Sequence, residues 1–204
     1  HGDSTVGTAS LSIDRLAEDM AALLDHLSIE QVWMFGHSLG GYTSLAFAER
    51  YANRLTGLAL VHSTAYPDSE EAKANRLKGM DSIRENGIRN YVDGLVPKLF
   101  APNQLTAQPD QVRYALELGY GTDPEGAIRT LEAMRSRPDR RQVLEQLQSP
   151  VMLIAGRHDQ VIPAQRVWCV QGSHIREAEL ENAGHMGMLE SPDPLVELIQ
   201  SFVG

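Results

Sequence analysis

Three short apolar runs and a fourth strand candidate alternate along the chain with stretches of helical periodicity. Continuous apolar runs predict strands that are buried on both faces, as in a parallel sheet. The predicted strands are Val32–Phe35, Leu58–Val61, Val151–Ala155 and Ile175–Leu180. The predicted helices around them are residues 12–27, 41–51, 164–171 and 192–202. This alternation predicts an α/β fold with a mostly parallel sheet flanked by helices.

The first predicted helix begins after Ser12, a residue type that caps helix N-termini. Its expected apolar face repeats at helical spacing. That face comprises Ile13, Leu16, Met20, Leu23, Leu24 and Leu27.

Residues 64–148 interrupt the alternation because they contain no strand pattern. Asp68 with Glu71 predicts a capping box that opens a helix. Further helices are expected near residues 111–118, 124–135 and 139–147, with prolines between them. We expect this block to be a helical cap inserted into a discontinuous core of residues 1–63 and 149–204. Its underside is expected to carry Leu95, Val96, Leu99 and Phe100, for which core packing is favoured over substrate contact.

The pentapeptide Gly36-His37-Ser38-Leu39-Gly40 stands between a predicted strand and a predicted helix. This G-x-S-x-G pattern is weak evidence alone, but in that position it indicates a nucleophile elbow. The sharp turn holds the serine in a strained conformation, and small neighbours relieve the crowding. Ser38 is therefore the candidate nucleophile.

A serine hydroxyl needs a base, and the base needs a carboxylate that orients it. Asp159 follows the third predicted strand, and His185 follows the fourth after Gly184. The order Ser, Asp, His is the one that this type of elbow requires. Ligand sites in open α/β sheets lie at these strand ends. Ser38, Asp159 and His185 are therefore predicted to form a catalytic triad.

Other histidines are weaker candidates for the base. His37 lies inside the elbow, too close along the chain to serve Ser38. His62 ends the second strand and has no acid paired with it there, and His158 is expected to point elsewhere. The same strand end has no carboxylate before Asp68, which favours Asp159 as the acid.

These motifs resemble the α/β-hydrolase family. The matching pieces are residues 36–41, Gly156-x-x-Asp159, and Ala183-Gly184-His185 followed by Met186 and a closing helix. The opening His1-Gly2-Asp3-Ser4 resembles the loop that the family places after its fourth strand. The resemblance covers nearly the whole chain and is specific for the fold, but not for a substrate. It implies that His37, His62 and Met186 border the substrate pocket.

The resemblance also implies an oxyanion hole in which the backbone N–H of Leu39 is one donor. The second donor usually comes from a loop after the third strand of the family, which would precede His1. Because the sequence begins at His1 without an initiator methionine, we expect a truncated or incompletely recorded chain. A naturally minimal hydrolase is the alternative, but its first strand would be an open apolar edge.

Composition fits a single domain with a substantial core, since 42% of the 204 residues are hydrophobic. The net charge of −9 argues against a nucleic-acid partner. No apolar run is long enough for a membrane span. The single cysteine, Cys169, excludes an internal disulfide, and neither a P-loop lysine nor an H-E-x-x-H motif is present. We expect no metal, no cofactor and a cytoplasmic location, although a signal peptide could precede His1.

The function expected from these residues is hydrolysis of a carboxylic ester or related acyl bond of a small molecule, through an acyl-enzyme. A cofactor-free perhydrolase of the haloperoxidase type and a carbon–carbon bond hydrolase would use the same triad and stay open as alternatives. A small-molecule receptor on a hydrolase scaffold is an alternative of another class. The serine at position 38 argues against dehalogenases and epoxide hydrolases, which use aspartate there. The sequence leaves the oligomeric state undetermined.

Overall fold

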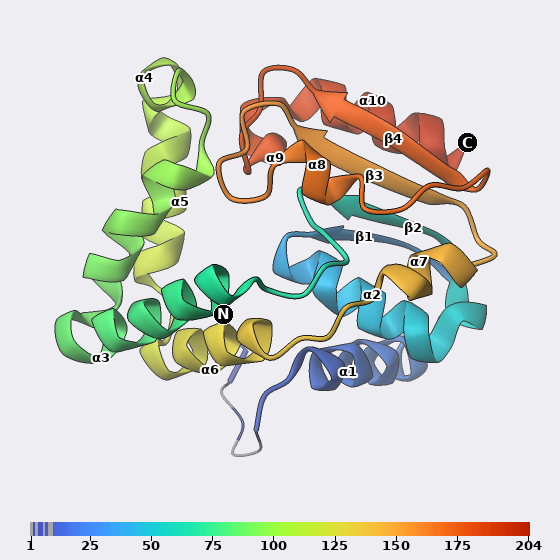
Figure 1. Cartoon of the computed structure of the whole chain (residues 1–204), viewed down its shortest axis with the longest axis horizontal. Coiled ribbons are helices and arrows are strands. Elements are labelled where there is room, and N and C mark those ends of the chain that lie inside the picture. The colour runs from blue at the N-terminus through green and yellow to red at the C-terminus, as the bar shows by residue number, and fades with distance from the viewer. Residues whose placement is uncertain (1, 3, 6, 8–9) are drawn as a thin grey trace.

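The computed structural model describes residues 2, 4–5, 7 and 10–204 of the chain. Its centre is a four-stranded sheet in the order β1-β2-β3-β4, in which every neighbouring pair is parallel (Figure 1). The strands are β1 (Val32–His37), β2 (Leu55–Val61), β3 (Val151–Gly156) and β4 (Ile175–Leu180). All four predicted strands are confirmed, and the first three extend beyond their predicted ends.

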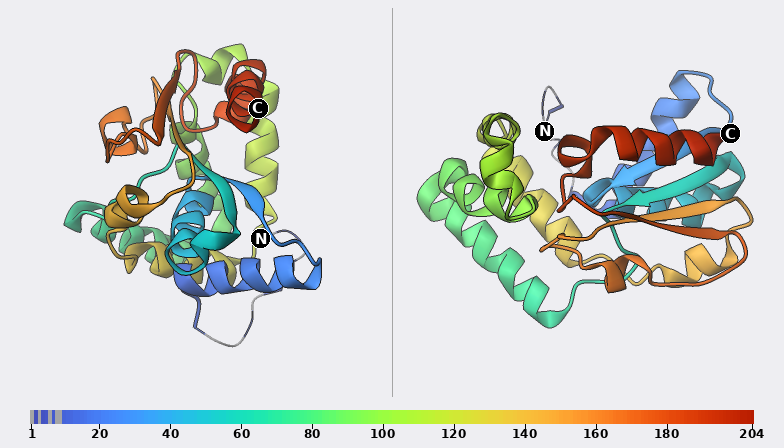
Figure 2. Two further views of the ribbon diagram at one scale, coloured as in Figure 1. Left: turned by 90° about the vertical axis from the view of Figure 1, so that its right-hand side faces the viewer. Right: turned by 90° about the horizontal axis from the view of Figure 1, so that it is seen from above.

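Helices cover both faces of this sheet (Figure 2). On one side lie α1 (Ile13–His26), α2 (Leu39–Tyr51) and α7 (Arg141–Gln146), and on the other lies α10 (Pro192–Val203). Successive side chains of β2 point alternately to the two faces of the sheet. Leu58 and Leu60 belong to the core under α1 and α2, whereas Ala59 and Val61 belong to the core under α10. This two-sided burial is the reason for the uninterrupted apolar runs in the sequence.

The helices of the α/β part alternate with the strands. They are α1 (Ile13–His26), α2 (Leu39–Tyr51), the 3-10 turn η1 (Ala52–Arg54), α8 (Ala164–Val167), α9 (Gly187–Glu190) and α10 (Pro192–Val203). The predicted helix at residues 164–171 is shorter than expected, since α8 ends at Val167.

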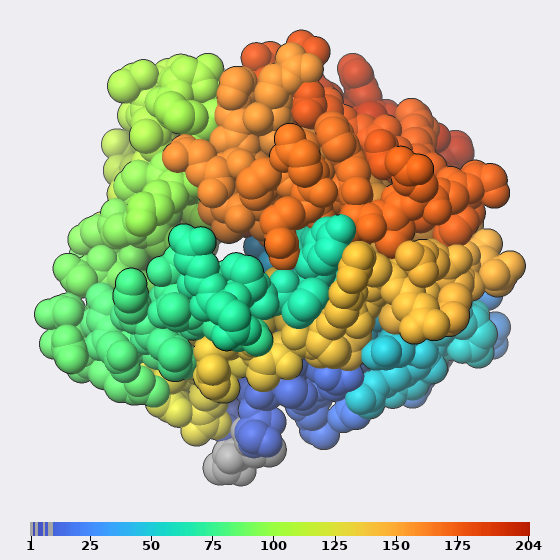
Figure 3. All heavy atoms as spheres, in the orientation of Figure 1, coloured from blue at the N-terminus to red at the C-terminus, as the bar shows by residue number. Residues whose placement is uncertain are grey.

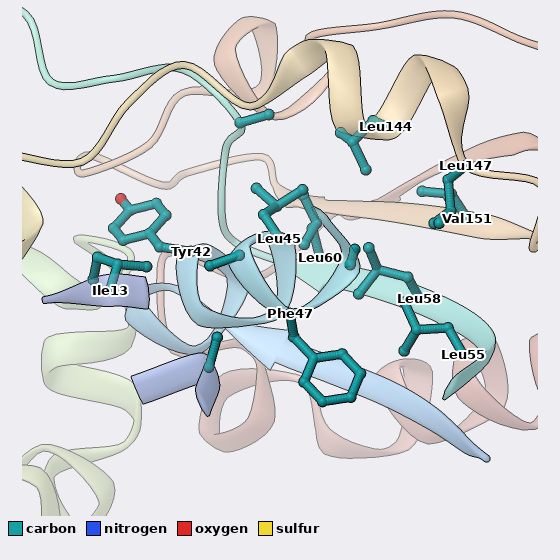
Figure 4. Close-up of a cluster of buried hydrophobic side chains, with 14 of the residues drawn as sticks. Ile13, Tyr42, Leu45, Phe47, Leu55, Leu58, Leu60, Leu144, Leu147 and Val151 are labelled. Atoms are coloured by element: carbon teal, nitrogen blue, oxygen red, sulfur yellow. The ribbon is translucent and has the colours of Figure 1, made fainter. Parts of the chain in front are cut away.

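The main core cluster lies between the sheet and the helices α1, α2 and α7 (Figure 4). Phe47, Leu58 and Leu60 have no exposed surface there. Burial of each such side chain stabilises the fold by about 1.5–3 kcal/mol. The cluster fixes α2 against the sheet, and with it the turn that precedes α2.

Helix α1 begins as predicted, because the Ser12 side chain accepts a hydrogen bond from Arg15 N. Its buried stripe is narrower than predicted and consists of Ile13, Ala17, Ala21 and Leu24. The small alanines let α1 pack directly on α2. Met20, Leu23 and Leu27, which were predicted on the apolar face, are exposed because they lie beside this narrow contact.

A block of helices between β2 and β3 lies beyond the carboxyl ends of the strands (Figures 1 and 2). We call it the helical insertion. Its helices are α3 (Glu70–Leu99), α4 (Gln104–Ala107), α5 (Pro109–Tyr120), α6 (Pro124–Arg135) and α7 (Arg141–Gln146). Of these, α7 does not lie at the carboxyl ends but packs beside α2 on the face of the sheet. It has apolar clusters of its own, one of which contains Val96 and Phe100.

The start of α3 differs from the prediction. Ser69 rather than Asp68 is the N-cap, and its hydroxyl accepts a hydrogen bond from Ala72 N. Asp68 is buried and forms ion pairs with Arg76 and Arg137. The predicted capping box was therefore wrong, because a residue one position later satisfies the helix terminus and the aspartate is used in tertiary contacts.

The predicted helix at 124–135 matches α6, whereas α3 is longer than any predicted element. It is broken at Gly87, where φ is +81°, a backbone conformation that suits glycine. No helix in the described part of the chain is long and apolar enough to cross a membrane.

Candidate active site

Each of the four parallel strands delivers one polar candidate residue at its carboxyl end. Ser38 follows β1, His62 follows β2, Asp159 is the third residue after β3, and His185 lies in the loop after β4. Since the strands are parallel and adjacent, these residues gather at one edge of the sheet, facing the helical insertion.

Ser38 occupies a strained turn between β1 and α2, with φ +50° and ψ −114°. A positive φ is uncommon for a residue other than glycine. The turn is tight because a Cβ on Gly36 would lie 2.6 Å from the carbonyl of Gly40 and 2.5 Å from Ser44 Oγ. A Cβ on Gly40 itself would meet no atom, so the crowding expected on both sides is observed on the Gly36 side only.

The turn is also held from β2. Ser38 N donates to Val61 O at 3.0 Å, and Ser63 Oγ donates to Ser38 O at 2.8 Å. Leu39 is the first residue of α2, so its N–H has no acceptor within its own helix. That N–H is free to serve an external oxygen.

Asp159 and His185 form a buried pair, with 2.8 Å between Asp159 Oδ2 and His185 Nδ1. The other carboxylate oxygen, Oδ1, accepts hydrogen bonds from Val161 N at 2.8 Å and Ile162 N at 2.9 Å. Burial raises the pKa of Asp159, but the hydrogen bonds from His185 and the two amides outweigh it and leave the pKa below its ordinary value. The carboxylate is therefore ionised at neutral pH.

Within the described residues no hydrogen bond joins Ser38 Oγ to His185, although one was expected. The main chain of His185 nevertheless reaches the elbow. His37 Nε2 lies 2.8 Å from His185 O, and the two rings are 5.0 Å apart between centroids. A hydrogen bond between a nucleophile and its base, such as the one expected between Ser38 and His185, is often long or poorly aligned in an unliganded site.

The end of α3 is bonded directly to the loops that carry Asp159 and His185. His185 N donates to Leu99 O at 2.8 Å, Gln160 Nε2 donates to Phe100 O at 3.3 Å, and Ala101 N donates to Glu190 Oε1 at 2.6 Å. Three consecutive residues of the helical insertion thus each make one main-chain bond to the site.

Glu190 is a residue that sequence reasoning missed. Besides Ala101 N, its carboxylate accepts hydrogen bonds from Gly184 N at 2.8 Å and Met186 N at 3.0 Å, on either side of His185. Burial raises the pKa of Glu190, and the three amide donors counteract this. A Cβ on Gly184 would lie 2.5 Å from Ala101 N, which explains the glycine before the histidine. No local signal separates Glu190 from the exposed carboxylates of the sequence.

His37, His62 and His185 form a cluster with ring centroids 5.0–6.0 Å apart. Burial, reinforced by His185, lowers the pKa of His37 to about 4 and that of His62 to about 3. Both rings are therefore neutral at physiological pH. In the part of the chain that the structure covers, no group of three ligating side chains is arranged to hold a metal ion.

The other predicted residues lie at the margin. Met186 is half-buried and packs against the cluster of Val96 and Phe100, so it lies between the helical insertion and the histidine loop. His158 is exposed. His1 and Asp3 of the predicted opening loop lie outside the described residues.

A cavity of about 780 Å³ adjoins the elbow on the side of β1. Leu39 and Gly40 line it together with Phe35, Met20 of α1 and Thr130 of α6. An opening on another side lies between the helical insertion and the segment after β3 (Figure 3). Leu39 thus borders a space that can hold a small molecule, whereas Ser38 and His185 are not among the residues that line it.

The sequence profile of the alpha/beta hydrolase fold matches residues 1–192. The chain belongs to the α/β-hydrolase family. It is 28% identical over 206 residues to 3-oxoadipate enol-lactonase 2 of Acinetobacter baylyi, covering 98% of this chain and 74% of that one. It is 30% identical over 213 residues to the dihydrolipoyllysine-residue acetyltransferase component of an acetoin cleaving system of Pseudomonas putida, covering all of this chain and 54% of that one.

Among solved structures, a thermophilic esterase from Thermogutta terrifontis superposes with a TM-score of 0.93 at 27% identity, over 99% of this chain and 75% of the esterase. The chain therefore spans about half the length of the acetyltransferase component and about three quarters of the lactonase and the esterase. The expected fold class is confirmed, and the chain is an α/β-hydrolase by family.

Proposed function

We propose that this α/β-hydrolase is a serine enzyme that cleaves a carboxylic ester or a related acyl bond of a small molecule. The observation that carries the proposal is the buried Asp159–His185 pair at 2.8 Å, next to a serine in a strained strand-to-helix turn. A base with a fixed tautomer beside an accessible hydroxyl nucleophile is the arrangement that acyl transfer needs, and Ser38 is half-buried here.

In this mechanism Ser38 Oγ attacks the carbonyl carbon, and His185 Nε2 takes the hydroxyl proton. Asp159 accepts from His185 Nδ1–H and stabilises the imidazolium that forms. The N–H of Leu39 stabilises the negative charge on the carbonyl oxygen. His185 then returns the proton to the leaving alcohol, and a water molecule repeats the attack on the acyl-enzyme.

We further propose that the helical insertion, residues 64–148, acts as a cap over this site. It faces the carboxyl ends of the strands, and its Leu99–Ala101 segment is bonded to the catalytic loops. Met186 and Leu189 pack in the same apolar cluster as the buried Val96 and Phe100, which holds the insertion against the histidine loop. His37 is proposed to border the pocket beside the elbow.

The relatives support this reaction class. An enol-lactonase opens a cyclic ester, and an esterase cleaves an open one, so both names describe attack on an ester carbonyl. Within the proposed class, lactones are therefore substrates worth testing beside open-chain esters.

Covalent labelling tests the nucleophile. An organophosphonate should add once to the protein, and peptide mass spectrometry should locate the adduct on Ser38. Ser38→Ala should lose the adduct and nearly all turnover of a graded series of p-nitrophenyl esters. An adduct on Ser44 or Ser63 instead would contradict the assignment, and Ser173→Ala, at an exposed serine away from the elbow, serves as the control.

A further inference from the structure

We propose that His62 is a positioning residue for the Asp159–His185 pair. In this proposal the Nδ1–H of His62 faces Asp159 Oδ2, the same carboxylate oxygen that is hydrogen-bonded to His185. The inference rests on the proposed function, since it concerns the acid of the proposed triad. It assigns a role to a side chain that the reaction steps leave unused.

His62 is buried without any exposed surface, and neither of its ring nitrogens has a hydrogen-bond partner. A buried polar atom without a partner is rare and calls for an explanation. Its Nδ1 lies 3.8 Å from Asp159 Oδ2. This distance exceeds that of a hydrogen bond, so the contact is that of an N–H dipole facing a charge.

The surroundings of the ring decide its tautomer. Nε2 lies against Gly187, where an added Cβ would come within 2.2 Å of it, and Cε1 lies near Gly156. Neither Gly187 nor Gly156 provides a hydrogen-bond acceptor for Nε2, which has no partner. The carboxylate on the Nδ1 side is the anionic acceptor at hand, which favours a proton on Nδ1 and none on Nε2.

The groups that face His62 come from three other elements. His37 at the end of β1 lies 5.9 Å away and His185 6.0 Å away between ring centroids, with Asp159 after β3. The Glu190 carboxylate of α9 is hydrogen-bonded to the amides of Ala101, Gly184 and Met186, and it is not among the groups that shift the pKa of His62. Burial and the two histidines hold the pKa of His62 down at about 3, against the favourable charge of Asp159. The ring therefore supplies a dipole and not a charge at neutral pH.

The backbone at this position is strained in the same way as at Ser38. His62 has φ +47°, a conformation in which asparagine is the best tolerated side chain after glycine. Its N–H donates to Ile154 O at 2.8 Å, which holds the residue at the end of β2. Asparagine also places its amide nitrogen as far along the side chain as Nδ1, so His62→Asn keeps both the backbone and a donor.

The direction of the effect follows from the dipole. A second donor spreads the charge on Oδ2 and weakens its pull on a protonated His185. Loss of the donor leaves the full charge facing His185, which favours the protonated form. His62→Leu should therefore move the acid limb of kcat/KM for p-nitrophenyl acetate to higher pH by roughly half a unit, whereas His62→Asn should leave it in place.

A limb that stays in place in His62→Leu while the plateau falls would overturn the proposal, because a purely structural role would lower activity without moving the limb. A limb displaced equally in His62→Asn and His62→Leu would also overturn it. Should His62→Leu fail to fold, the tautomer is measured in the unaltered protein by nitrogen-15 NMR of labelled histidine. A proton on Nδ1 supports the proposal, and a proton on Nε2 overturns it.

The two proposals fail separately. Full turnover by Ser38→Ala would remove the proposed function, but the tautomer of His62 would still be read in the resting protein. Conversely, a normal loss of activity in Ser38→Ala with an Nε2–H tautomer at His62 would remove only the present inference.

Discussion

At the scale of single residues, both oxygens of the Asp159 carboxylate have hydrogen-bond partners. Two amides hold Oδ1, and His185 holds Oδ2. These donors keep the pKa of Asp159 below its ordinary value although the side chain is buried. The carboxylate can therefore act as a permanent negative charge beside His185.

If the proposed triad operates, Asp159→Asn is expected to lower kcat by about 10⁴, as loss of the acid does in characterised serine triads. The acid limb of kcat/KM should also move to lower pH, because the charge that favours protonated His185 is removed. Both are measured with p-nitrophenyl esters between pH 5 and 9. Asp110→Asn, an exposed carboxylate on α5, is the control. Equal activity of the two variants would mean that the acid is misassigned.

The candidate residues differ in how far the sequence could predict them. Ser38, Asp159 and His185 each follow a predicted strand and carry local signals, such as flanking glycines. Glu190 carries none, because its role depends on amides from Ala101 and from the histidine loop that meet only in the folded chain. The unpartnered state of His62 likewise follows from packing against Gly187 and not from its neighbours in sequence.

At the scale of elements, the histidine loop and the end of α3 behave as one unit. Glu190 binds the amides on both sides of His185 and the amide of Ala101 with one buried carboxylate. A carboxylate can accept all three hydrogen bonds, whereas a carboxamide has one accepting oxygen and would leave amides unpaired.

Glu190→Gln is therefore expected to destabilise the protein by about 1–3 kcal/mol, the cost of an unsatisfied buried donor. Activity should fall more than stability alone explains, because His185 loses its anchoring on both sides. Urea unfolding and ester turnover measure the two effects. Glu197→Gln, exposed on α10, should change neither. Unchanged activity in a destabilised Glu190→Gln would limit Glu190 to a structural role.

The elements themselves were predictable to different degrees. The central strands were found because burial on both faces gives continuous apolar runs, as in β3, whereas the edge strand β4 carries charged residues and has a weaker pattern. The helical insertion was harder to predict from the sequence, since its helices pack on one another and show a weaker hydrophobic periodicity. The break at Gly87 and the capping by Ser69 instead of Asp68 depend on tertiary contacts such as the Asp68–Arg137 ion pair.

At the scale of the whole molecule, the helical insertion is tied to the α/β part at both of its connections. Arg140 is almost fully buried and pairs with Asp14 of α1 and Glu49 of α2, while its N–H donates to Ala65 O. Arg137 lies 3.8 Å above the ring of Tyr42. These contacts hold the segment that enters the helical insertion next to the segment that leaves it, and they fix both against α1 and α2.

The free energy of unfolding should depend on pH below about 6.5 because of the buried histidines. His37 and His62 have folded-state pKa values of about 4 and about 3, below the ordinary value of 6.5. The unfolded chain therefore binds more protons between these values, so stability is complete above pH 6.5 and falls as the pH is lowered toward 4. The loss is on the order of 2–3 kcal/mol per histidine at pH 4.

Urea unfolding at a series of pH values measures this slope, and His62→Asn should make it shallower. Asp68 and Asp159, whose pKa values are lowered, add a further loss only below about pH 4. A free energy of unfolding that is constant from pH 7 to 5 would contradict the neutral, buried state of the two histidines.

The three main-chain bonds of Leu99, Phe100 and Ala101 also bear on how such enzymes can be rebuilt. An insertion exchanged between relatives as a module would bring its own chain to this junction. If the graft includes residues 99–101 without the histidine loop, the carbonyl that accepts from His185 N comes from a foreign backbone. The same holds for the amide of residue 101, which donates to Glu190. Because the end of α3 and the histidine loop are bonded to each other, the natural unit for recombination is the insertion together with that loop.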